Sequence, residues 1–190
     1  MGLKASIFPV AVAVAAFAAV PAMANTLTFQ GVTFNTTAVD SDTLELGILN
    51  ATSATGNWTG INYLKAFEVK DIGTVTAASI TSGPGFSNGV NNELNANAGC
   101  QGGGGGFCFT GSAILLTSSM TWKIDYTGTG LDFSAPSLKV QFLTNLTDTK
   151  ATGDLLSQTL PVPEPETYAM LAAGLGLMGF IGNRRKQRTL

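Results

Sequence analysis

Hydrophobic and polar residues alternate along several stretches of the chain, with a period of two. In MTWKIDY, residues 120–126, the large apolar and aromatic side chains take every second position, and SLKVQFL at 137–143 repeats the scheme. TLELGIL at 43–49 follows it too, whereas TLTFQGVTF at 26–34 and NYLKAFEVKDI at 62–72 are less regular. Successive side chains of a strand point to opposite faces, so the pattern predicts antiparallel strands with one buried and one solvated face.

Turn-forming residues separate these stretches, and no segment between residues 25 and 160 has a helical period. Short alternating strands with turns between them are typical of two-layered all-β proteins. We therefore predict one domain over residues 25–160, an antiparallel β-sandwich of jelly-roll-like form. Residues 85–109 are expected to form a long loop, and Lys139 and Gln141 belong to the polar face of their strand.

The N-terminal segment has the three parts of a secretory signal peptide. Lys4 precedes an apolar run over residues 7–20, and Ala22 and Ala24 place small residues where a signal peptidase reads the chain. The alternative, a permanent N-terminal anchor helix, is disfavoured because the run is shorter than the roughly 20 residues that a bilayer requires. We predict a signal helix within residues 1–24 and cleavage after Ala24.

A second apolar segment lies near the C-terminus. Residues 168–182 are uncharged and would span roughly 22 Å as a helix, which is short for a bilayer. Arg184, Arg185 and Lys186 follow directly, within a basic end at 184–188, and positive charges of this kind stay on the cytoplasmic side of a membrane. We predict a short transmembrane helix over 168–182 that stops at these basic residues.

Two cysteines, Cys100 and Cys108, flank a run of five glycines. An even number of cysteines in an exported chain predicts a disulfide, and the glycines allow the short loop to fold back on itself. The alternative is a redox or metal-binding pair. The chain contains no histidine that would complete a metal site, so the structural disulfide is favoured, and we expect no metal or other cofactor.

Charge and histidine content restrict the function further. Between residues 25 and 163, ten acidic and five basic side chains give a formal charge of −5, and none of the basic residues is arginine. Such a surface argues against nucleic acid as a partner, because phosphate binding needs clustered Lys and Arg. Without histidine there is no Ser-His-Asp or Cys-His arrangement. Paired carboxylates remain available for glycoside hydrolysis.

Two further groups of residues are candidates for binding. Asp40, Asp42 and Glu45 supply hard oxygen ligands at short spacing and are a calcium candidate, although the glycine of an EF-hand loop is missing. Trp58 lies in a turn-rich stretch and is a candidate for an exposed platform on which sugar rings stack. Trp122 lies on the apolar face of its strand and is expected in the core.

The C-terminal 30 residues, 161–190, resemble the PEP-CTERM sorting domain of Gram-negative bacteria that make extracellular polysaccharide. The resemblance rests on Val162-Pro163-Glu164-Pro165-Glu166, the apolar run and the RRK cluster, in that order. It implies that exosortase, a membrane-embedded cysteine protease or transpeptidase, recognises Pro163, Glu164 and Pro165. It also implies transit through the inner membrane after signal peptidase has acted, and arrival at the cell surface or extracellular matrix.

These observations favour an exported, non-enzymatic surface or matrix protein, sorted through its Pro-Glu-Pro signal. The first alternative is a carbohydrate-binding module that acts on exopolysaccharide, and the second is a carboxylate-dependent glycoside hydrolase. The sequence of the predicted domain does not decide between them.

Overall fold

The computed structural model describes residues 24–161 and 174–175 of the 190-residue chain. The predicted signal helix and nearly all of the predicted transmembrane helix lie outside these residues. Of residues 168–182, only Gly174 and Leu175 are described, and both are helical. Within the described residues, no helix is long and apolar enough to cross a membrane.

The described domain consists of strands joined by turns and loops. The strands are β1 (Ala24–Phe29), β2 (Val32–Ala38), β3 (Thr43–Leu49), β4 (Tyr63–Lys70), β5 (Thr74–Ser82), β6 (Leu94–Asn95), β7 (Gly99–Cys100), β8 (Gly106–Leu115), β9 (Ser119–Thr129), β10 (Ser137–Leu143) and β11 (Leu156–Thr159). Two single turns of 3₁₀-helix, η1 (Ala51–Ser53) and η2 (Gly56–Trp58), lie between β3 and β4.

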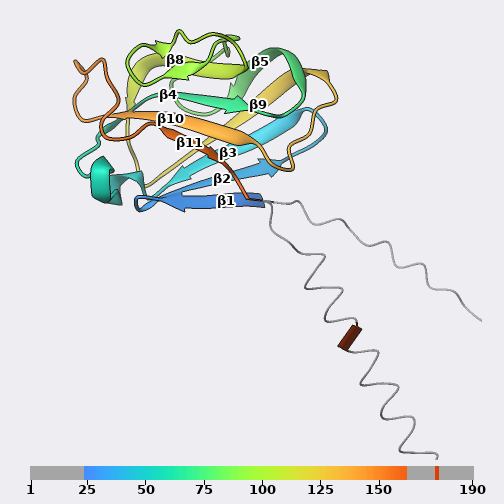
Figure 1. Ribbon diagram of the computed structural model, residues 1–190, viewed down its shortest axis with the longest axis horizontal. Coiled ribbons are helices and arrows are strands. Elements are labelled where there is room, and N and C mark those ends of the chain that lie inside the picture. The colour runs from blue at the N-terminus through green and yellow to red at the C-terminus, as the bar shows by residue number, and fades with distance from the viewer. Residues whose placement is uncertain (1–23, 162–173, 176–190) are drawn as a thin grey trace, which may run out of the picture.

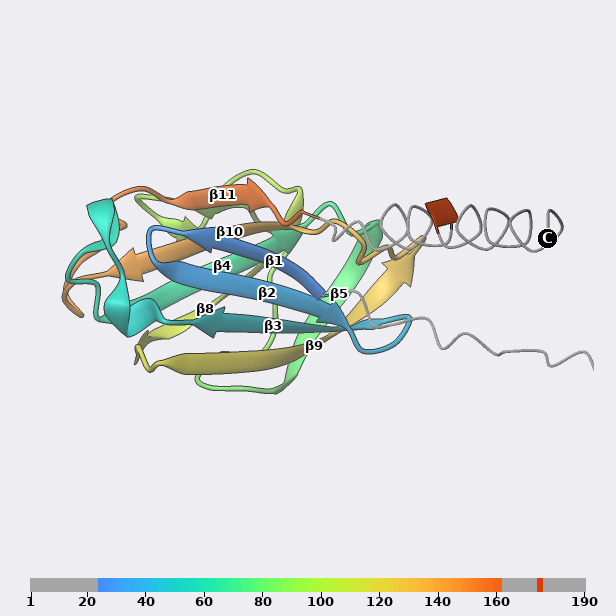
Figure 2. The same cartoon turned by 90° about the horizontal axis from the view of Figure 1, so that it is seen from below.

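The strands form two larger antiparallel sheets that face each other (Figures 1 and 2). Sheet A has the order β1-β2-β3-β9-β5, sheet B has the order β11-β10-β4-β8, and β6 and β7 form a small third sheet. The predicted antiparallel all-β class is therefore confirmed. The nine strands of the two larger sheets are divided five and four, and the jelly-roll-like form of the sandwich stays a prediction.

One hydrophobic core fills the space between sheets A and B. Leu46 and Trp122 from sheet A and Phe67 and Phe142 from sheet B are among its fully buried residues. Phe67 and Trp122 face each other across the sheets with ring centroids 5.2 Å apart. The period-two pattern of β3, β9 and β10 correctly placed Leu46, Trp122 and Phe142 on the inner faces.

The stretch 26–34, which alternates less regularly, is a β-hairpin of two strands. Gln30 and Gly31 have φ values of 47° and 81°, and Phe29 pairs directly with Val32. Positive φ at both central residues is the geometry of the two-residue turns that suit the twist of a hairpin. The turn lies where the alternation of TLTFQGVTF is interrupted.

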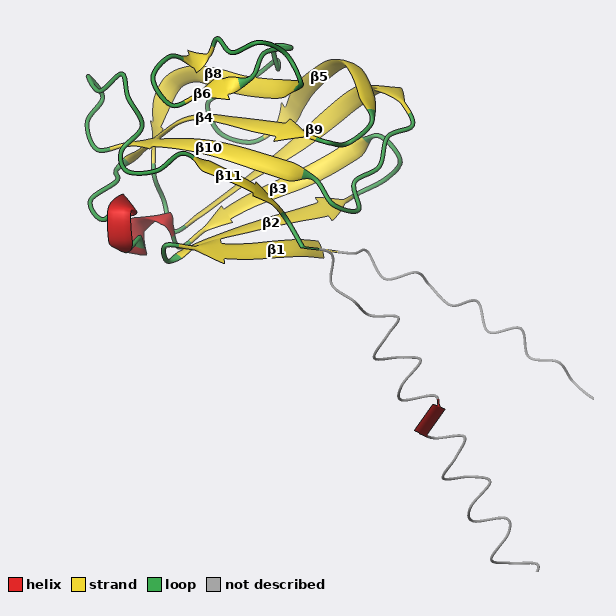
Figure 3. Cartoon of the chain, in the orientation of Figure 1, coloured by secondary structure: helices red, strands yellow, loops and turns green. Residues whose placement is uncertain are grey.

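Three strands of the two larger sheets have no clear signal in the sequence, namely β5, β8 and β11 (Figure 3). The pairing of β5 with β9 shifts register between Val75 and Ala77 and again between Ile80 and Ser82, which breaks the period of two. Strand β8 begins inside the segment that was expected to be a loop, residues 85–109. The loop prediction therefore holds only for residues 85–105. The small β6–β7 sheet lies within that stretch.

The outer face of sheet B is also buried over β10 and the middle of β4, which the strand pattern did not predict, whereas β11 and the later part of β8 carry exposed residues. Every residue of β10 is buried, and this includes Lys139 and Gln141, which alternation had placed on a polar face. The segment of residues 91–102 lies over this face and carries β6 and β7. We call this segment the cover. A strand pattern describes a single sheet, so it does not report a loop that packs on the second face.

Both ends of the described domain meet at one end of the sandwich (Figures 1 and 3). The side-chain amide of Asn25 donates to the carbonyl of Phe133, and the backbone N–H of Leu160 donates to the carbonyl of Pro136. Asn25 and Leu160 are both fully buried. The chain therefore enters and leaves the domain at fixed points beside the same loop.

Candidate functional site

The covered face of sheet B is the most unusual part of the described domain, because it holds charged groups out of water. Glu68 of β4 and Lys139 of β10 are opposite each other in the strand register, and both are buried. Buried charges are costly unless they are paired and hydrogen-bonded. The contacts of these two residues therefore decide whether the face is structural or is available for chemistry.

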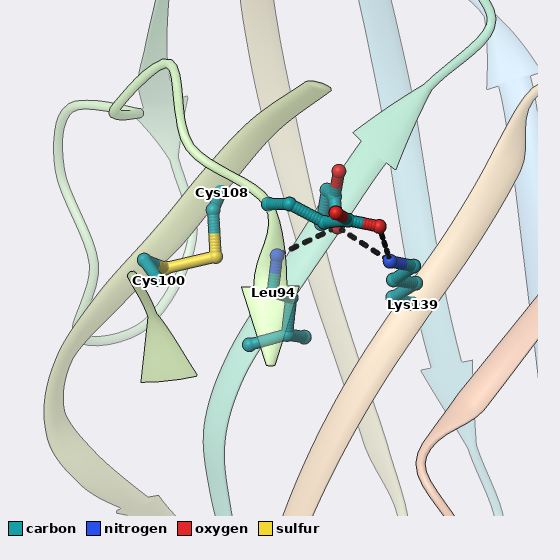
Figure 4. Close-up of polar contacts among 6 residues, drawn as sticks. Leu94, Cys100, Cys108 and Lys139 are labelled. Atoms are coloured by element: carbon teal, nitrogen blue, oxygen red, sulfur yellow. Dashed lines mark hydrogen bonds and ion pairs between the residues drawn. A yellow bond between two sulfur atoms is a disulfide. The ribbon is translucent and has the colours of Figure 1, made fainter. Parts of the chain in front are cut away.

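Glu68 and Lys139 are held together between the sheet and the cover (Figure 4). The Nζ of Lys139 lies 3.7 Å from Oε2 of Glu68, and the backbone N–H of Leu94 donates to the same oxygen over 2.8 Å. Glu93, also in the cover, accepts a hydrogen bond from Lys139. The cluster thus joins two strands of the sheet to two successive residues of the cover.

Glu93 differs from Glu68 in its exposure, because 41% of its side chain is accessible to solvent. The hydrogen bond from Lys139 and its positive charge hold the pKa of the Glu93 carboxyl below the usual range of glutamate. Glu93 is therefore an anion near neutral pH. Two carboxylates on one ammonium group make a structural clamp between the sheet and the cover.

The clamp leaves little space around its buried carboxylate. A Cβ on Gly106 would lie 2.4 Å from Oε1 of Glu68, so only glycine fits at that position. Oε1 itself is buried and has no hydrogen-bond partner among the described residues, as is also true of Oε1 of Gln141. The side-chain N–H of Gln141 donates to the carbonyl of Ala96 in the cover.

A disulfide pins the cover at its far end. Cys100 of β7 and Cys108 of β8 are bonded, with 5.6 Å between their Cα atoms (Figure 4). Both sulfurs pack with Ala66 and Leu94 in a second, smaller hydrophobic cluster outside sheet B. The cover is thus held to the sheet by a covalent bond, an ion cluster and apolar contacts.

Trp58 is not an exposed platform, and that prediction is wrong. The indole is fully buried and packs edge-on against Phe29, Phe34 and Phe142. Its N–H donates to the carbonyl of Asp154 over 2.7 Å. The single turn η2 directs the side chain inward, so a turn-rich neighbourhood did not mean an exposed side chain.

The three candidate calcium ligands do not come together in one group. Oδ1 of Asp40 accepts the backbone N–H groups of Asp42 and Thr43 over 3.1 and 2.8 Å, which closes the β2–β3 turn. These hydrogen bonds hold the pKa of Asp40 below its usual range. Glu45 lies on β3 opposite Lys123 of β9. Over residues 24–161 and 174–175, no three carboxylate or cysteine side chains are grouped closely enough to hold a metal ion.

Three of the open grooves on the described domain are candidate places for a ligand. Their volumes are about 330, 720 and 500 Å³, and each is lined by a single carboxylate, from Asp71, Asp148 and Asp125 respectively. None of these three grooves therefore brings together the two carboxylates that glycoside hydrolysis requires. The 720 Å³ groove, which we call the polar groove, borders the cover and is lined by Lys65, Asn97, Gln101, Thr110, Gln141 and Asp148, among others.

The predicted sorting residues Pro163, Glu164 and Pro165 lie outside the described residues, as do Arg184, Arg185 and Lys186. The last described residue of the domain, Pro161, leads directly into them. No curated protein and no solved structure matches the chain. A family model does match this tail: residues 161–186 carry the PEP-CTERM protein-sorting motif.

Proposed function

We propose that the protein is an exported, non-enzymatic component of the cell surface or extracellular matrix of a Gram-negative, exopolysaccharide-producing cell. The sorting motif at residues 161–186 carries this proposal, because it implies export, membrane-anchored transit and processing by exosortase. Exosortase reads Pro163, Glu164 and Pro165 while the short apolar segment and the basic end hold the chain in the inner membrane.

The described domain supports a structural role. Its carboxylate pair, Glu68 and Glu93, shares one lysine, and Glu68 is fully buried beneath the cover. A disulfide and a continuous hydrophobic core suit a domain that stays folded outside the cell. These features stabilise the fold.

The experiment that tests sorting compares two hosts that differ only in exosortase. The full-length protein is expressed in each, and intact mass and cell fractionation are measured. In the exosortase-bearing host the protein should lose its basic end and reach the surface or medium. In the host without the enzyme it should stay in the inner membrane at the mass of the chain without its signal peptide. Equal masses and locations in both hosts would refute the proposal.

Binding of exopolysaccharide is a second candidate function, and it rests on the polar groove. Amide, hydroxyl and charged side chains line this groove, among them Gln101, Thr110 and Asp148, and such groups can hydrogen-bond the hydroxyls of a sugar. The test measures whether the domain is retained on the host's polysaccharide. Retention of the wild type, together with loss of retention in the double variant Gln101→Ala with Thr110→Val, would support this role. Equal retention of the wild type and the variant would exclude the groove as the binding site.

A further inference from the structure

The distance between the folded domain and the sorting motif is very short. Leu160 is fully buried, and only Pro161 and Val162 separate it from Pro163. A fully extended chain spans roughly 3.3–3.6 Å per residue, so the Cα of Pro163 lies at most about 11 Å from that of Leu160. An enzyme that encloses Pro163 in an active site must therefore come very close to the folded domain.

The last strand is held firmly and does not easily lengthen this tether. Strand β11 pairs with β10 from Val140↔Leu156 to Ser137↔Thr159, and the hydroxyls of Ser137 and Thr159 are 2.9 Å apart. Leu156 and Leu160 both belong to the main core. Peeling β11 away would break this ladder and expose two leucines to water.

The surface that surrounds the exit point can be defined from the strand register. Residue pairs Ala24↔Thr37 and Lys70↔Ser137 place the turns at 39–42 and 71–73 at the same end as the segment 132–136. The N–H of Asp132 donates to the carbonyl of Ile72, and Pro136 accepts from Leu160. We call residues 39–42, 71–73 and 132–136 the exit end.

We propose that the exit end is a contact surface for the membrane-embedded enzyme that reads the sorting motif, so that the folded domain takes part in recognition. This inference rests on the proposed sorting function and adds a second recognition surface to it. The enzyme, which lies in the inner membrane, reaches the motif only by packing its rim on the outer side of that membrane against the exit end. The opposite end, which carries η1 and the β8–β9 turn, stays clear of the enzyme.

The test places bulk on each end of the full-length protein. Ser41→Tyr with Ser134→Tyr enlarges the exit end at two exposed serines. Ser53→Tyr with Ser118→Tyr adds the same bulk at the opposite end, again at exposed serines. In an exosortase-bearing host, the exit-end variant should lose its tail severalfold more slowly than the wild type, and the control variant at the wild-type rate.

A longer tether between the domain and the motif distinguishes a steric clash with the enzyme from misfolding of the exit-end variant. With about ten Gly and Ser residues inserted between Pro161 and Val162, a flexible span of roughly 17 Å root-mean-square is added, and the exit-end variant should recover the wild-type rate. Unchanged processing of the exit-end variant with the native tether would overturn the proposal. Faster processing after Leu156→Ala would overturn it too, because the fold would then mask the motif. Absence of processing in the wild type would instead refute the sorting function itself.

Discussion

The Nζ of Lys139 lies 3.7 Å from Oε2 of Glu68, and the cover closes over both groups. The pair connects the two central strands of sheet B on the face that points away from the main core. Because Leu94 of the cover donates its N–H to the same carboxylate, the ion pair also fixes the position of the cover. Around this pair the two central strands of sheet B are buried on both faces as a result, whereas an antiparallel sheet commonly has one solvated face.

Removal of the lysine charge should destabilise the domain strongly. Lys139→Met leaves the Glu68 carboxylate buried without its cation, and breaking a buried pair in this way costs about 3–5 kcal/mol. The free energy of unfolding can be measured in urea by tryptophan fluorescence, since Trp58 and Trp122 are both fully buried. We expect a lower urea midpoint with an unchanged slope.

A second variant identifies the cause of that loss. Glu68→Gln combined with Lys139→Met removes both charges and retains a side-chain oxygen that can accept the N–H of Leu94. The double variant should be more stable than Lys139→Met alone, because no unpaired charge remains buried. If both are destabilised equally, lost packing of the lysine stem and not the unpaired charge explains the effect.

The stability contributed by Glu93 should depend on pH. Its folded-state pKa is lowered by Lys139, so the contribution is present above the unfolded pKa of about 4.3 and is lost as pH falls through the lower folded value. Glu93→Gln removes this contribution. The difference in urea midpoint between the wild type and Glu93→Gln should therefore be constant from neutral pH to about pH 5 and shrink below pH 4. A difference that persists at the lowest pH would contradict the assignment.

The sequence was sufficient to predict those parts of the fold that depend on neighbouring residues. Alternation in β3, β9 and β10 placed Leu46, Trp122 and Phe142 in the core. It could not predict the burial of Lys139 and Gln141, because that burial comes from a segment about 45 residues away in the chain. Nor did it predict that η2 directs Trp58 inward, since turn-forming residues set the path of the backbone and not the surroundings of a side chain.

The disulfide should contribute to the stability of the cover. Cys100→Ala with Cys108→Ala removes a cross-link over a sequence separation of 8, and loop-closure entropy gives a cost of about 2–3 kcal/mol. Hydrogen exchange of the Leu94 amide should accelerate more than that of β9 amides, because the cover would open before the sheets separate. Mass spectrometry that finds two free thiols in the exported protein would show that the bond does not form.

Trp58 should matter for stability and not for sugar binding. Trp58→Ala removes a fully buried indole from its contacts with Phe29, Phe34 and Phe142, and such truncations cost about 3–5 kcal/mol. Trp58→Phe retains a ring and loses mainly the hydrogen bond to Asp154, so about 1 kcal/mol is expected. Loss of polysaccharide binding by a folded Trp58→Phe protein would revive the platform hypothesis.

The sorting motif could be predicted from the sequence for a different reason from the one that made the strands predictable. An enzyme that binds an extended peptide recognises residues in their linear order, and Pro163, Glu164 and Pro165 are consecutive. The ion cluster requires three segments that meet only after folding, so no local pattern marks it. Glu68 in particular stands in a stretch whose alternation is interrupted by a register shift between Leu64 and Ala66.

The prolines of the motif should be required for processing. Because proline lacks a backbone N–H and interrupts helices, we predict that Pro163 and Pro165 keep a helix from extending outward from the apolar segment and leave the motif extended and accessible. Pro163→Ala with Pro165→Ala should allow the helix to extend through the motif and withdraw it from the enzyme. We expect this variant to keep its basic end and remain in the membrane, whereas the wild type loses roughly its last 25 residues because a span this short is a marginal anchor.

Intact mass and fractionation in an exosortase-bearing host decide this prediction. Pro161→Ala is the matched control, because it changes a proline of the same tail that lies outside the Pro163–Pro165 motif, and it should be processed like the wild type. Wild-type protein at the surface that still carries Arg184, Arg185 and Lys186 would show that the tail is a plain membrane anchor. Equal processing of the wild type and the double variant would show that the enzyme does not need an extended motif, and recognition would then rest on other residues of the tail.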